Sequence, residues 1–427
     1  MIETIRNAWK IEELRKKILF TLLIILLYRV GNAIPVPYIN TDLLHSYFST
    51  MQNTVLGLLN VMSGGAFSNA TIFALSIQPY INASIIIQLL CIAIPALERL
   101  SKEGGEEGKK KIASYTRYAT VAIGLLQGYG YYMLLKNNGY LLPDAPKVWS
   151  AFVIVFTFTS GSALVMWLGE QITEFGIGNG ISMILFASII SRLPTAIRTT
   201  IANVVVGNLK WWAAILVFLG AIALIVLIVF VNDAERRIPV QYSKRVVGRK
   251  MYGGQSTHLP MKVNMSGVMP IIFAQSIASL PATIAAFTGK SDGWFSRNFG
   301  TNSILYAVVY LLLIIFFAYF YSTIQFNPIE VANNLKKNGG YIPGFRPGKP
   351  TSQYIQKGLN NITLFGAIYL GIIAVVPILI AHFSDAAALT GVSLGGTSII
   401  IVVGVALETV RALEAQMLMR NYKGFLD

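Results

Sequence analysis

Cysteine and histidine are scarce in this chain, and their scarcity excludes several kinds of chemistry. Among 427 residues there are one cysteine, Cys91, and three histidines, His45, His258 and His382, far apart in the sequence. One cysteine can form neither an internal disulfide nor a cysteine-based metal cluster. We therefore expect no metal site and no cofactor.

Catalytic motifs are also missing. The sequence contains no G-x-x-x-x-G-K-[ST], H-E-x-x-H or G-x-S-x-G pattern, which are the signals of ATP hydrolysis, zinc proteolysis and serine hydrolysis. The stretch GIGNGIS at 176–182 has no preceding strand and no lysine, so it is interpreted as a tight turn that caps the fifth span. Glu170 and Glu174 are spaced to share a helix face and form a candidate acid pair, although solvated carboxylates are common at the end of a span. The sequence does not predict an enzyme.

Charged residues are few, whereas long apolar runs are plentiful. Charged residues make up 12% of the chain and hydrophobic residues 54%, and the mean hydropathy is +0.60. Such a composition is typical of a protein whose solvent is largely lipid. The net charge of +15 then indicates basic cytoplasmic loops before it indicates nucleic-acid binding.

Apolar runs of bilayer length predict an all-α membrane protein with ten transmembrane helices. The fifth run is interrupted by Arg192 and Pro194. Before the first run, residues 1–17 mix Ile5, Trp9 and Leu14 with charges, which predicts an amphipathic helix on the membrane surface. The first run is interpreted as a membrane anchor rather than a removed signal peptide. The ten predicted spans are 18–34, 71–95, 112–135, 149–168, 181–199, 211–231, 267–288, 303–326, 361–381 and 397–414.

The distribution of lysine and arginine predicts the orientation. Of the 34 basic residues, 26 lie in the two terminal segments and in the connections after spans 2, 6 and 8, whereas 7 lie in the other connections. Both termini and the long basic loops 232–264 and 327–360 are therefore expected to be cytoplasmic. Ten spans divide into an amino-terminal half, 18–205, and a carboxyl-terminal half, 206–427. Because each half has an odd number of spans, the halves are expected to have opposite orientations, as in an inverted repeat.

One segment between the first two spans breaks the pattern. A short apolar piece ends in Ser63, Gly64 and Gly65, and Pro79 prevents a regular helix through the following stretch. Irregular backbone at membrane depth requires protein or a water-filled cavity around it. The segment is a candidate plug or re-entrant element near 57–69, and an ordinary external loop with a surface helix is an equally good interpretation.

Charged residues inside the predicted spans are sparse, with Arg29, Arg192 and Glu408 as the main candidates. Ion-coupled transporters place ionisable residues near the membrane midplane. Two hypotheses remain from the residues: a passive channel energised by partners, and a secondary transporter with an inverted repeat. The lack of midplane carboxylates favours the channel.

Five strings resemble the signature segments of bacterial SecY, the central subunit of the Sec protein-conducting channel. They occur in both halves and in the order that this family uses, and the departure is a carboxyl tail shorter than in many members. The strings are MSGGAFSNATIFALSIQPYINASIIIQLL, WLGEQITEFGIGNGIS, QSTHLPMKVNMSGVMPIIFA, FNPIEVANNLKKNGGYIPGFRPG and LGGTSIIIVVGV.

The resemblance implies a SecY-like fold and a pore-forming subunit of the protein translocase. Such a subunit passes unfolded secretory polypeptides across the membrane and releases transmembrane segments sideways into the bilayer. A ring of aliphatic side chains suits that pore, because it excludes water and offers a moving polypeptide no polar partner. The resemblance places this ring at Ile81, Ile85, Leu185, Ile272 and Ile401. It places the plug at Asn60, Met62, Ser63, Gly64, Gly65 and Phe67.

The resemblance further implies a lateral gate between spans 2 and 3 and spans 7 and 8. Gln88 and Gln275 lie on gate helices and can hydrogen-bond when the gate is closed, and the alternative is that they join helices without switching. The basic loops resemble the docking surface for the motor ATPase SecA and for the ribosome. Positive-inside charge that attracts anionic lipids is the alternative, although topology needs only a few charges near the span ends. The docking residues would be Arg236, Arg237, Lys244, Arg245, Arg249, Lys250, Lys336, Lys337, Arg346 and Lys349.

The remaining partners also follow from the resemblance. They are the small membrane subunits SecE and SecG and polypeptides that carry signal sequences. The implied location is the bacterial cell membrane.

Overall fold

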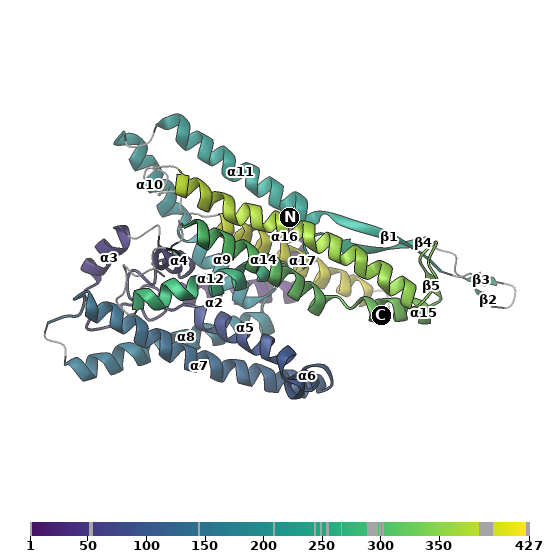
Figure 1. The fold of residues 1–427 in the computed structure, drawn as a ribbon, viewed down its shortest axis with the longest axis horizontal. Coiled ribbons are helices and arrows are strands. Elements are labelled where there is room, and N and C mark those ends of the chain that lie inside the picture. Colours follow the sequence, from purple (N-terminus) through teal and green to yellow (C-terminus); the bar gives the residue numbers. More distant parts are fainter. Residues whose placement is uncertain are drawn as a thin grey trace.

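The protein is a bundle of long helices with a small β-sheet at one end (Figure 1). The computed structural model describes residues 2–50, 54–143, 146–207, 210–242, 245–247, 250–252, 256–265, 267–287, 298, 300, 303–383 and 396–423. The helices of the first half are α1 (Ile2–Lys10), α2 (Glu12–Gly31), α3 (Thr41–Thr50), α4 (Val55–Met62), α5 (Gln78–Ala93), α6 (Pro95–Lys102), α7 (Gly105–Asn137), α8 (Lys147–Phe175), α9 (Gly180–Ile190) and α10 (Leu193–Val205).

The second half has six described helices and the strands. The helices are α11 (Trp211–Asp233), α12 (Met269–Phe287), α14 (Ile304–Gln325), α15 (Pro328–Lys337), α16 (Lys349–Phe383) and α17 (Gly396–Lys423). The strands are β1 (Glu235–Tyr242), β2 (Arg245–Val247), β3 (Lys250–Tyr252), β4 (Ser256–Lys262) and β5 (Gly340–Tyr341).

Every predicted span overlaps a helix, but the number of spans is not confirmed. By length and composition, six helices among the described residues are able to cross a membrane, or seven if α5 and α6 form one span bent by 102°. The helices that fall short are α2 and α7, which carry charged first turns, and the shorter helix α12. A helix satisfies all its interior backbone groups internally, and lipid demands this.

Three boundaries differ from the sequence prediction. The second span begins as a helix only at Gln78, with Pro79 in its first turn, because proline lacks the amide that a helix interior needs. The amino-terminal helix ends at Lys10 rather than continuing to residue 17. The fifth span is two helices, α9 and α10, that meet at Arg192.

Helix packing follows the same order in both halves. In the first half α7 packs between α5 and α8, and in the second half α14 packs between α12 and α16. The halves meet where α5 and α7 contact α12, where α4 contacts α12, and where α9 contacts α17. Helix α11 lies at one side of the bundle in Figure 1 and buries only Ile228, Val231 and Asn232. An apolar helix that is exposed on nearly all sides is suited to face lipid.

The long loops contain β-structure that the all-α prediction left out. Strands β1 and β4 form an antiparallel hairpin, and β5 from the other long loop pairs with β1, which gives the order β4-β1-β5. Ile238 and Val240 on β1 alternate with exposed residues and pack on α16 through Ile355 and Leu359. In Figure 1 these strands and α15 lie at the end of the molecule opposite to α3 and α10.

Candidate functional site

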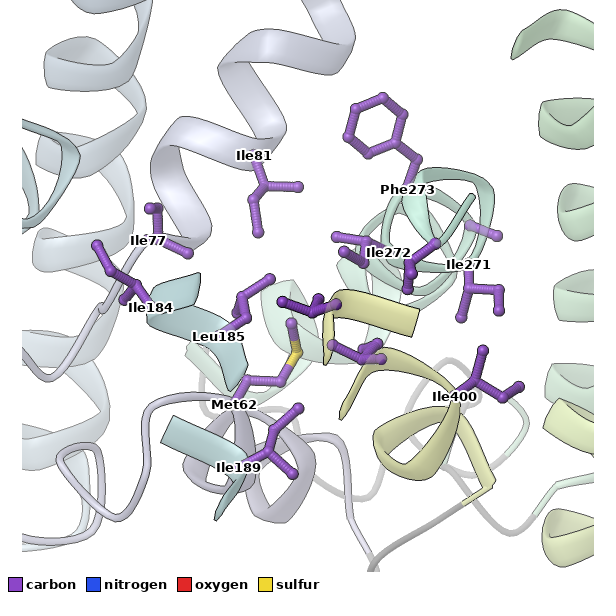
Figure 2. Close-up of a cluster of buried hydrophobic side chains, with 14 of the residues drawn as sticks. Met62, Ile77, Ile81, Ile184, Leu185, Ile189, Ile271, Ile272, Phe273 and Ile400 are labelled. Carbon is purple, nitrogen blue, oxygen red and sulfur yellow. The ribbon is translucent and has the colours of Figure 1, made fainter. Parts of the chain in front are cut away.

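The five predicted ring residues lie in one buried apolar cluster, and Figure 2 labels three of them, Ile81, Leu185 and Ile272. Their exposed fractions are between 1% and 3%. They come from four helices of both halves: Ile81 and Ile85 from α5, Leu185 from α9, Ile272 from α12 and Ile401 from α17. The structure therefore brings together side chains that are up to 320 positions apart in the sequence.

The predicted plug contributes a side chain to the same cluster. Met62, the last residue of α4, is 6% exposed and lies near Leu185 and Ile189 in Figure 2. Its helix contacts α9 and α12, so it touches one ring-bearing helix from each half. Burying a methionine side chain contributes roughly 1.5–3 kcal/mol. The apolar cluster is therefore continuous from the predicted ring into the predicted plug.

The turn that follows α4 is held by hydrogen bonds within the plug. The amide of Ser68 donates to Asn60 Oδ1 at 2.9 Å, and the amide of Phe67 donates to Ser63 Oγ at 3.1 Å. Gly64 and Gly65 have φ values of +68° and +92°, which glycine adopts at little cost. The glycines therefore allow the chain to turn sharply where α4 ends.

A buried tyrosine, Tyr28 of α2, joins the plug to two other elements. Its hydroxyl lies 2.8 Å from Ser188 Oγ of α9 and 3.2 Å from Ser76 Oγ, and it donates to the Ser63 carbonyl at 3.5 Å. The Tyr28 side chain is fully buried, so an unpaired hydroxyl there would be costly. Sequence reasoning missed this residue. The available signal was a phenol inside an apolar span, because a buried tyrosine hydroxyl usually needs a partner.

An aromatic contact holds the other end of the plug. The rings of Phe67 and Tyr131 of α7 stack with centroids 4.3 Å apart, and the Tyr131 hydroxyl donates to the Phe67 carbonyl. Phe48 of α3 meets Phe67 edge-on at 5.3 Å. These rings belong to a second buried apolar cluster, which includes side chains of α3, α7 and α8. Tyr28 therefore contacts the predicted plug at Ser63, and Tyr131 contacts it at Phe67.

Two of the predicted intramembrane charges also contact the plug. Arg192 Nη1, at the α9–α10 junction, donates to the Asn60 carbonyl at 3.2 Å. A Cβ atom at Gly64 would lie 2.8 Å from Arg29 Nη1 of α2, so the guanidinium is packed directly against the plug backbone. Arg29 and Arg192 therefore lie beside the candidate plug rather than along a chain of ionisable residues, which is unlike the arrangement of an ion-coupled transporter.

The predicted gate residues do not bond each other. Gln88 of α5 accepts a 2.6 Å hydrogen bond from the Tyr321 hydroxyl of α14, whereas Gln275 of α12 is buried and its Oε1 has no protein partner among the described residues. A second bond, from Gln78 Nε2 of α5 to Ser276 Oγ of α12 at 3.1 Å, joins α5 to α12. A cavity of about 30 Å³ lies here between α5, α7, α12 and the plug. Helix α5 therefore makes one polar contact with α12 and another with α14.

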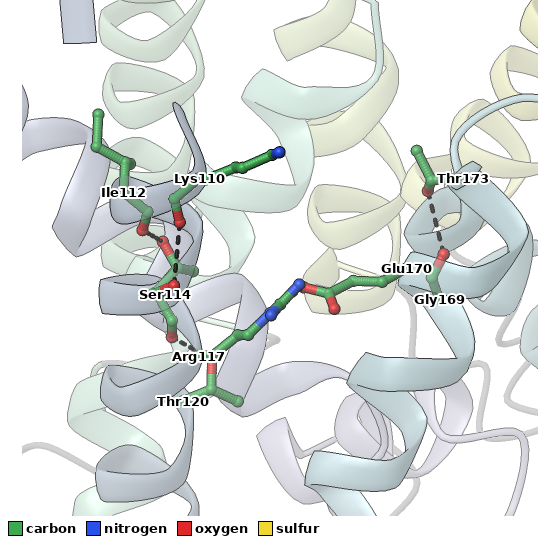
Figure 3. A network of polar contacts seen from close by, with 9 residues as sticks. Lys110, Ile112, Ser114, Arg117, Thr120, Gly169, Glu170 and Thr173 are labelled. Carbon is green, nitrogen blue, oxygen red and sulfur yellow. Dashed lines mark hydrogen bonds and ion pairs between the residues drawn. The ribbon is translucent and has the colours of Figure 1, made fainter. Parts of the chain in front are cut away.

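Glu170, one of the two carboxylates of the candidate acid pair, contacts a neighbouring helix. Glu170 of α8 forms a 3.0 Å ion pair with Arg117 of α7, and Figure 3 shows the two side chains pointing toward each other between the helices. The neighbouring hydroxyls of Ser114 and Thr173 donate to carbonyls four residues earlier in their own helices. Glu170 thus joins α7 to α8. The GIGNGIS turn is confirmed as a helix cap, because Asn179 Oδ1 accepts from the amides of Ile181 and Ser182.

The basic loops form one platform. Tyr341 on β5 donates to Gln241 on β1 at 3.0 Å, so the two loops are joined at the sheet. Phe345 stacks on Tyr354 at 4.2 Å, and the Arg346 carbonyl accepts from Thr351 Oγ1, which leaves the Arg346 side chain exposed on a fixed turn. Arg236, Arg237, Lys336, Lys337 and Lys349 are also exposed. Arg245 and Lys250 begin β2 and β3, and Lys244 and Arg249 lie outside the described residues.

Comparisons with known proteins agree with this geometry. The SecY family model matches residues 71–410. A protein translocase subunit SecY from Streptomyces scabiei is 45% identical over 443 residues, and one from Mycobacterium tuberculosis is 42% identical over 446 residues, each comparison covering all of both chains.

Solved structures share the fold at low sequence identity. A structure described as a protein conducting channel has a TM-score of 0.65 and 17% identity, covering 95% of this chain and 93% of that chain. Sec61 in a canine ribosome-channel complex has a TM-score of 0.60 and 16% identity, with coverage of 95% and 93%.

The fold defines a class of polytopic helical membrane protein, and a buried apolar cluster joins helices from the two parts of the chain. The predicted fold class is confirmed by the solved channels. The chain belongs to the SecY family. It is accordingly a transport subunit and not an enzyme.

Proposed function

We propose that this chain forms the polypeptide-conducting pore of a protein translocase, with the five-residue ring as its constriction and residues 57–69 as its plug. The observation that carries the proposal is the shared cluster of ring residues and Met62. Ring side chains from both halves meet there, so separating the halves opens the constriction. Membership of a family named for protein translocation supports the polypeptide as the transported molecule.

The chemistry of the ring fits a transported polypeptide. A narrow apolar constriction loses its water and thereby blocks ions. Aliphatic side chains make no directional bonds, so polypeptides of any sequence meet a similar surface. A secondary transporter would instead need a selective polar site near the midplane.

The boundary of α5 and α7 with α12 and α14 is the proposed lateral gate, through which signal sequences and transmembrane segments reach the lipid. The bonds Gln78–Ser276 and Gln88–Tyr321 cross it, and each is a side-chain pair that water is able to replace when the gate opens. Gln88 therefore serves the gate through Tyr321 rather than through Gln275. Gln275 lies buried beside the same interface and supplies an unpaired acceptor there.

The basic platform is the proposed docking surface for the motor ATPase SecA and for the ribosome. Arginine fits carboxylates on a protein and phosphates on ribosomal RNA. Related channels are described in ribosome complexes from dog and yeast, which supports the ribosome as a partner. In this proposal the platform and both termini face the cytoplasm of a bacterial cell, the two halves form an inverted repeat, and SecE, SecG and anionic lipids complete the complex.

A cross-linking experiment tests the pore assignment. The native cysteine is first removed as Cys91→Ser, and single cysteines are then introduced as Ile85→Cys, Ile401→Cys and, for a lipid-facing control, Leu216→Cys, which is 63% exposed on α11. A secretory polypeptide with one cysteine is stalled during translocation and exposed to an oxidant. We expect disulfides to the two ring positions and none to residue 216. Equal cross-linking at all three positions would remove the ring assignment.

A further inference from the structure

Helix α17 contacts both ends of the hairpin loop. Arg411 Nη2 donates to the Asn232 carbonyl at 2.8 Å and pairs with the Asp233 carboxylate at 2.5 Å, at the end of α11 where the loop begins. One turn earlier on α17, the carboxylate of Glu408 lies directly against the backbone of Gly267, where the loop ends. Residues three apart share one face of a helix, so one face of α17 reaches the loop's entry and its exit.

A third contact joins the entry and the exit directly. Asn264 Nδ2 donates to Asn232 Oδ1 at 2.8 Å, and the amide of Val263 donates to the Ala234 carbonyl at 3.0 Å. Asn232 is 8% exposed, so its two contacts are largely shielded from water, whereas the Asp233 carboxylate is mostly exposed and screened. The contacts of Asn232 therefore contribute most of the strength of this junction.

The loop exit is tightly packed, and α12 begins only two residues after Gly267. Gly267 has a φ of +64°, and a Cβ atom there would lie 2.5 Å from Glu408 Oε1. Only one residue, Val268, then separates this contact from the first residue of α12, which carries ring residue Ile272. A displacement of the hairpin base is therefore transmitted to α12 within one helical turn.

We propose that Glu408, Arg411, Asn232 and Asn264 form a clamp that couples the docking platform to the gate helix α12. The clamp makes the hairpin base, the end of α11 and the start of α12 one rigid body. When a motor or ribosome displaces the hairpin, α12 moves with it and the constriction widens. Without the clamp the hairpin bends at its base and α12 stays in place. These four are positioning residues that act through α12.

The proposal rests on the proposed function, and the experiment separates the two. Arg411→Ala, Asn264→Ala and the double variant are reconstituted in the complete translocase. Arg15→Ala is the matched control, because Arg15 is an exposed basic residue on another helix. Four quantities are measured: motor affinity, basal ion conductance, motor-driven translocation and thermal stability. If the unmutated protein fails to bind the motor or to translocate, the proposed function is wrong. If only the clamp variants behave like the unmutated protein, the clamp is wrong and the proposed function stands.

We expect Arg411→Ala to keep its motor affinity within about twofold and to lose about fivefold or more of motor-driven translocation, the scale of a typical coupling between sites. Arg411→Lys should recover part of the loss, since lysine retains a donor for the Asn232 carbonyl. The double variant should be no worse than the poorer single variant, because both changes release the same junction. Parent-like translocation in Arg411→Ala, or a fall in motor affinity as large as the fall in translocation, would overturn the clamp. Full additivity of the two changes would also overturn it.

Discussion

Replacing Ile272 with asparagine should unseal the constriction. Ile272 is 2% exposed, so its burial contributes roughly 1.5–3 kcal/mol to the closed arrangement. A buried amide without partners adds a penalty of about 1–3 kcal/mol in the same direction. The open state hydrates the amide and avoids that penalty. Even a shift of about 2.5 kcal/mol, the sum of the two lower limits, raises the ratio of open to closed channels roughly 60-fold.

Single-channel recording in planar bilayers measures the shift directly. Ile272→Asn should raise the resting open probability, and proteoliposomes with this variant should translocate a substrate whose signal sequence is weakened. Ile314→Asn is the matched control, because Ile314 is 0% exposed in the same cluster but lies on α14 outside the ring. A sealed Ile272→Asn channel would refute the reasoning. Equal leakage in the control would show that any polar group in the core opens the protein.

Three other predictions concern the plug and the platform. Deleting residues 60–69 should raise ion leakage in bilayers while translocation remains largely possible, and unchanged conductance would remove the plug assignment. Tyr28→Phe should destabilise the seated plug by about 1–3 kcal/mol, because the hydroxyls of Ser76 and Ser188 lose their partner; the resting open probability in bilayers measures this, and a parent-like value would contradict it. Arg346→Ala should weaken motor or ribosome binding by roughly 2–5 kcal/mol, with partial recovery in Arg346→Lys. If correctly inserted Arg346→Ala binds the motor and the ribosome with wild-type affinity, the docking role of Arg346 is wrong, and the charge of this loop serves topology and anionic-lipid binding instead.

Bilayer physics made the helices predictable from the sequence. Lipid offers no hydrogen bonds, so a run such as Trp211–Val231 has a helix as its only stable form when it crosses alone. The same rule does not fix where a helix starts. Residues 71–77 are as apolar as the helix that follows, and their turns depend on contacts with α8 and α2 that the sequence does not display.

The strands of the long loops were missed because charge dominated the interpretation of these segments. The alternation at Ile238 and Val240 was present in the sequence, but four residues of alternation between arginines are a weak signal. The pairing of β1 with β5 joins segments about 100 residues apart, and such a contact has no local signature. The two basic loops form one platform because β5 pairs with β1, and this pairing is not apparent from either loop sequence alone.

The ring residues could not be selected from their chemistry. Isoleucine and leucine are the commonest residues of any membrane helix, and the resemblance to a family was the reason to choose these five. The structure adds that they are buried together with Met62. It also adds Tyr28, Tyr131 and the clamp residue Arg411, whose importance depends on partners far away in the sequence.

In the proposed function the plug both seals the pore and leaves it, and two kinds of contact around residues 57–69 suit these two roles. At the ring, Met62 contributes apolar burial, which excludes water without fixing a direction. Tyr28 and Arg192 contact the plug through hydrogen bonds, which water would replace with little net change once the segment enters a hydrated vestibule. The free energy of release is then of the order of one or two buried side chains, roughly 2–5 kcal/mol. In the proposed function that amount would hold most channels closed, and insertion of an apolar signal sequence at the lateral gate would supply it.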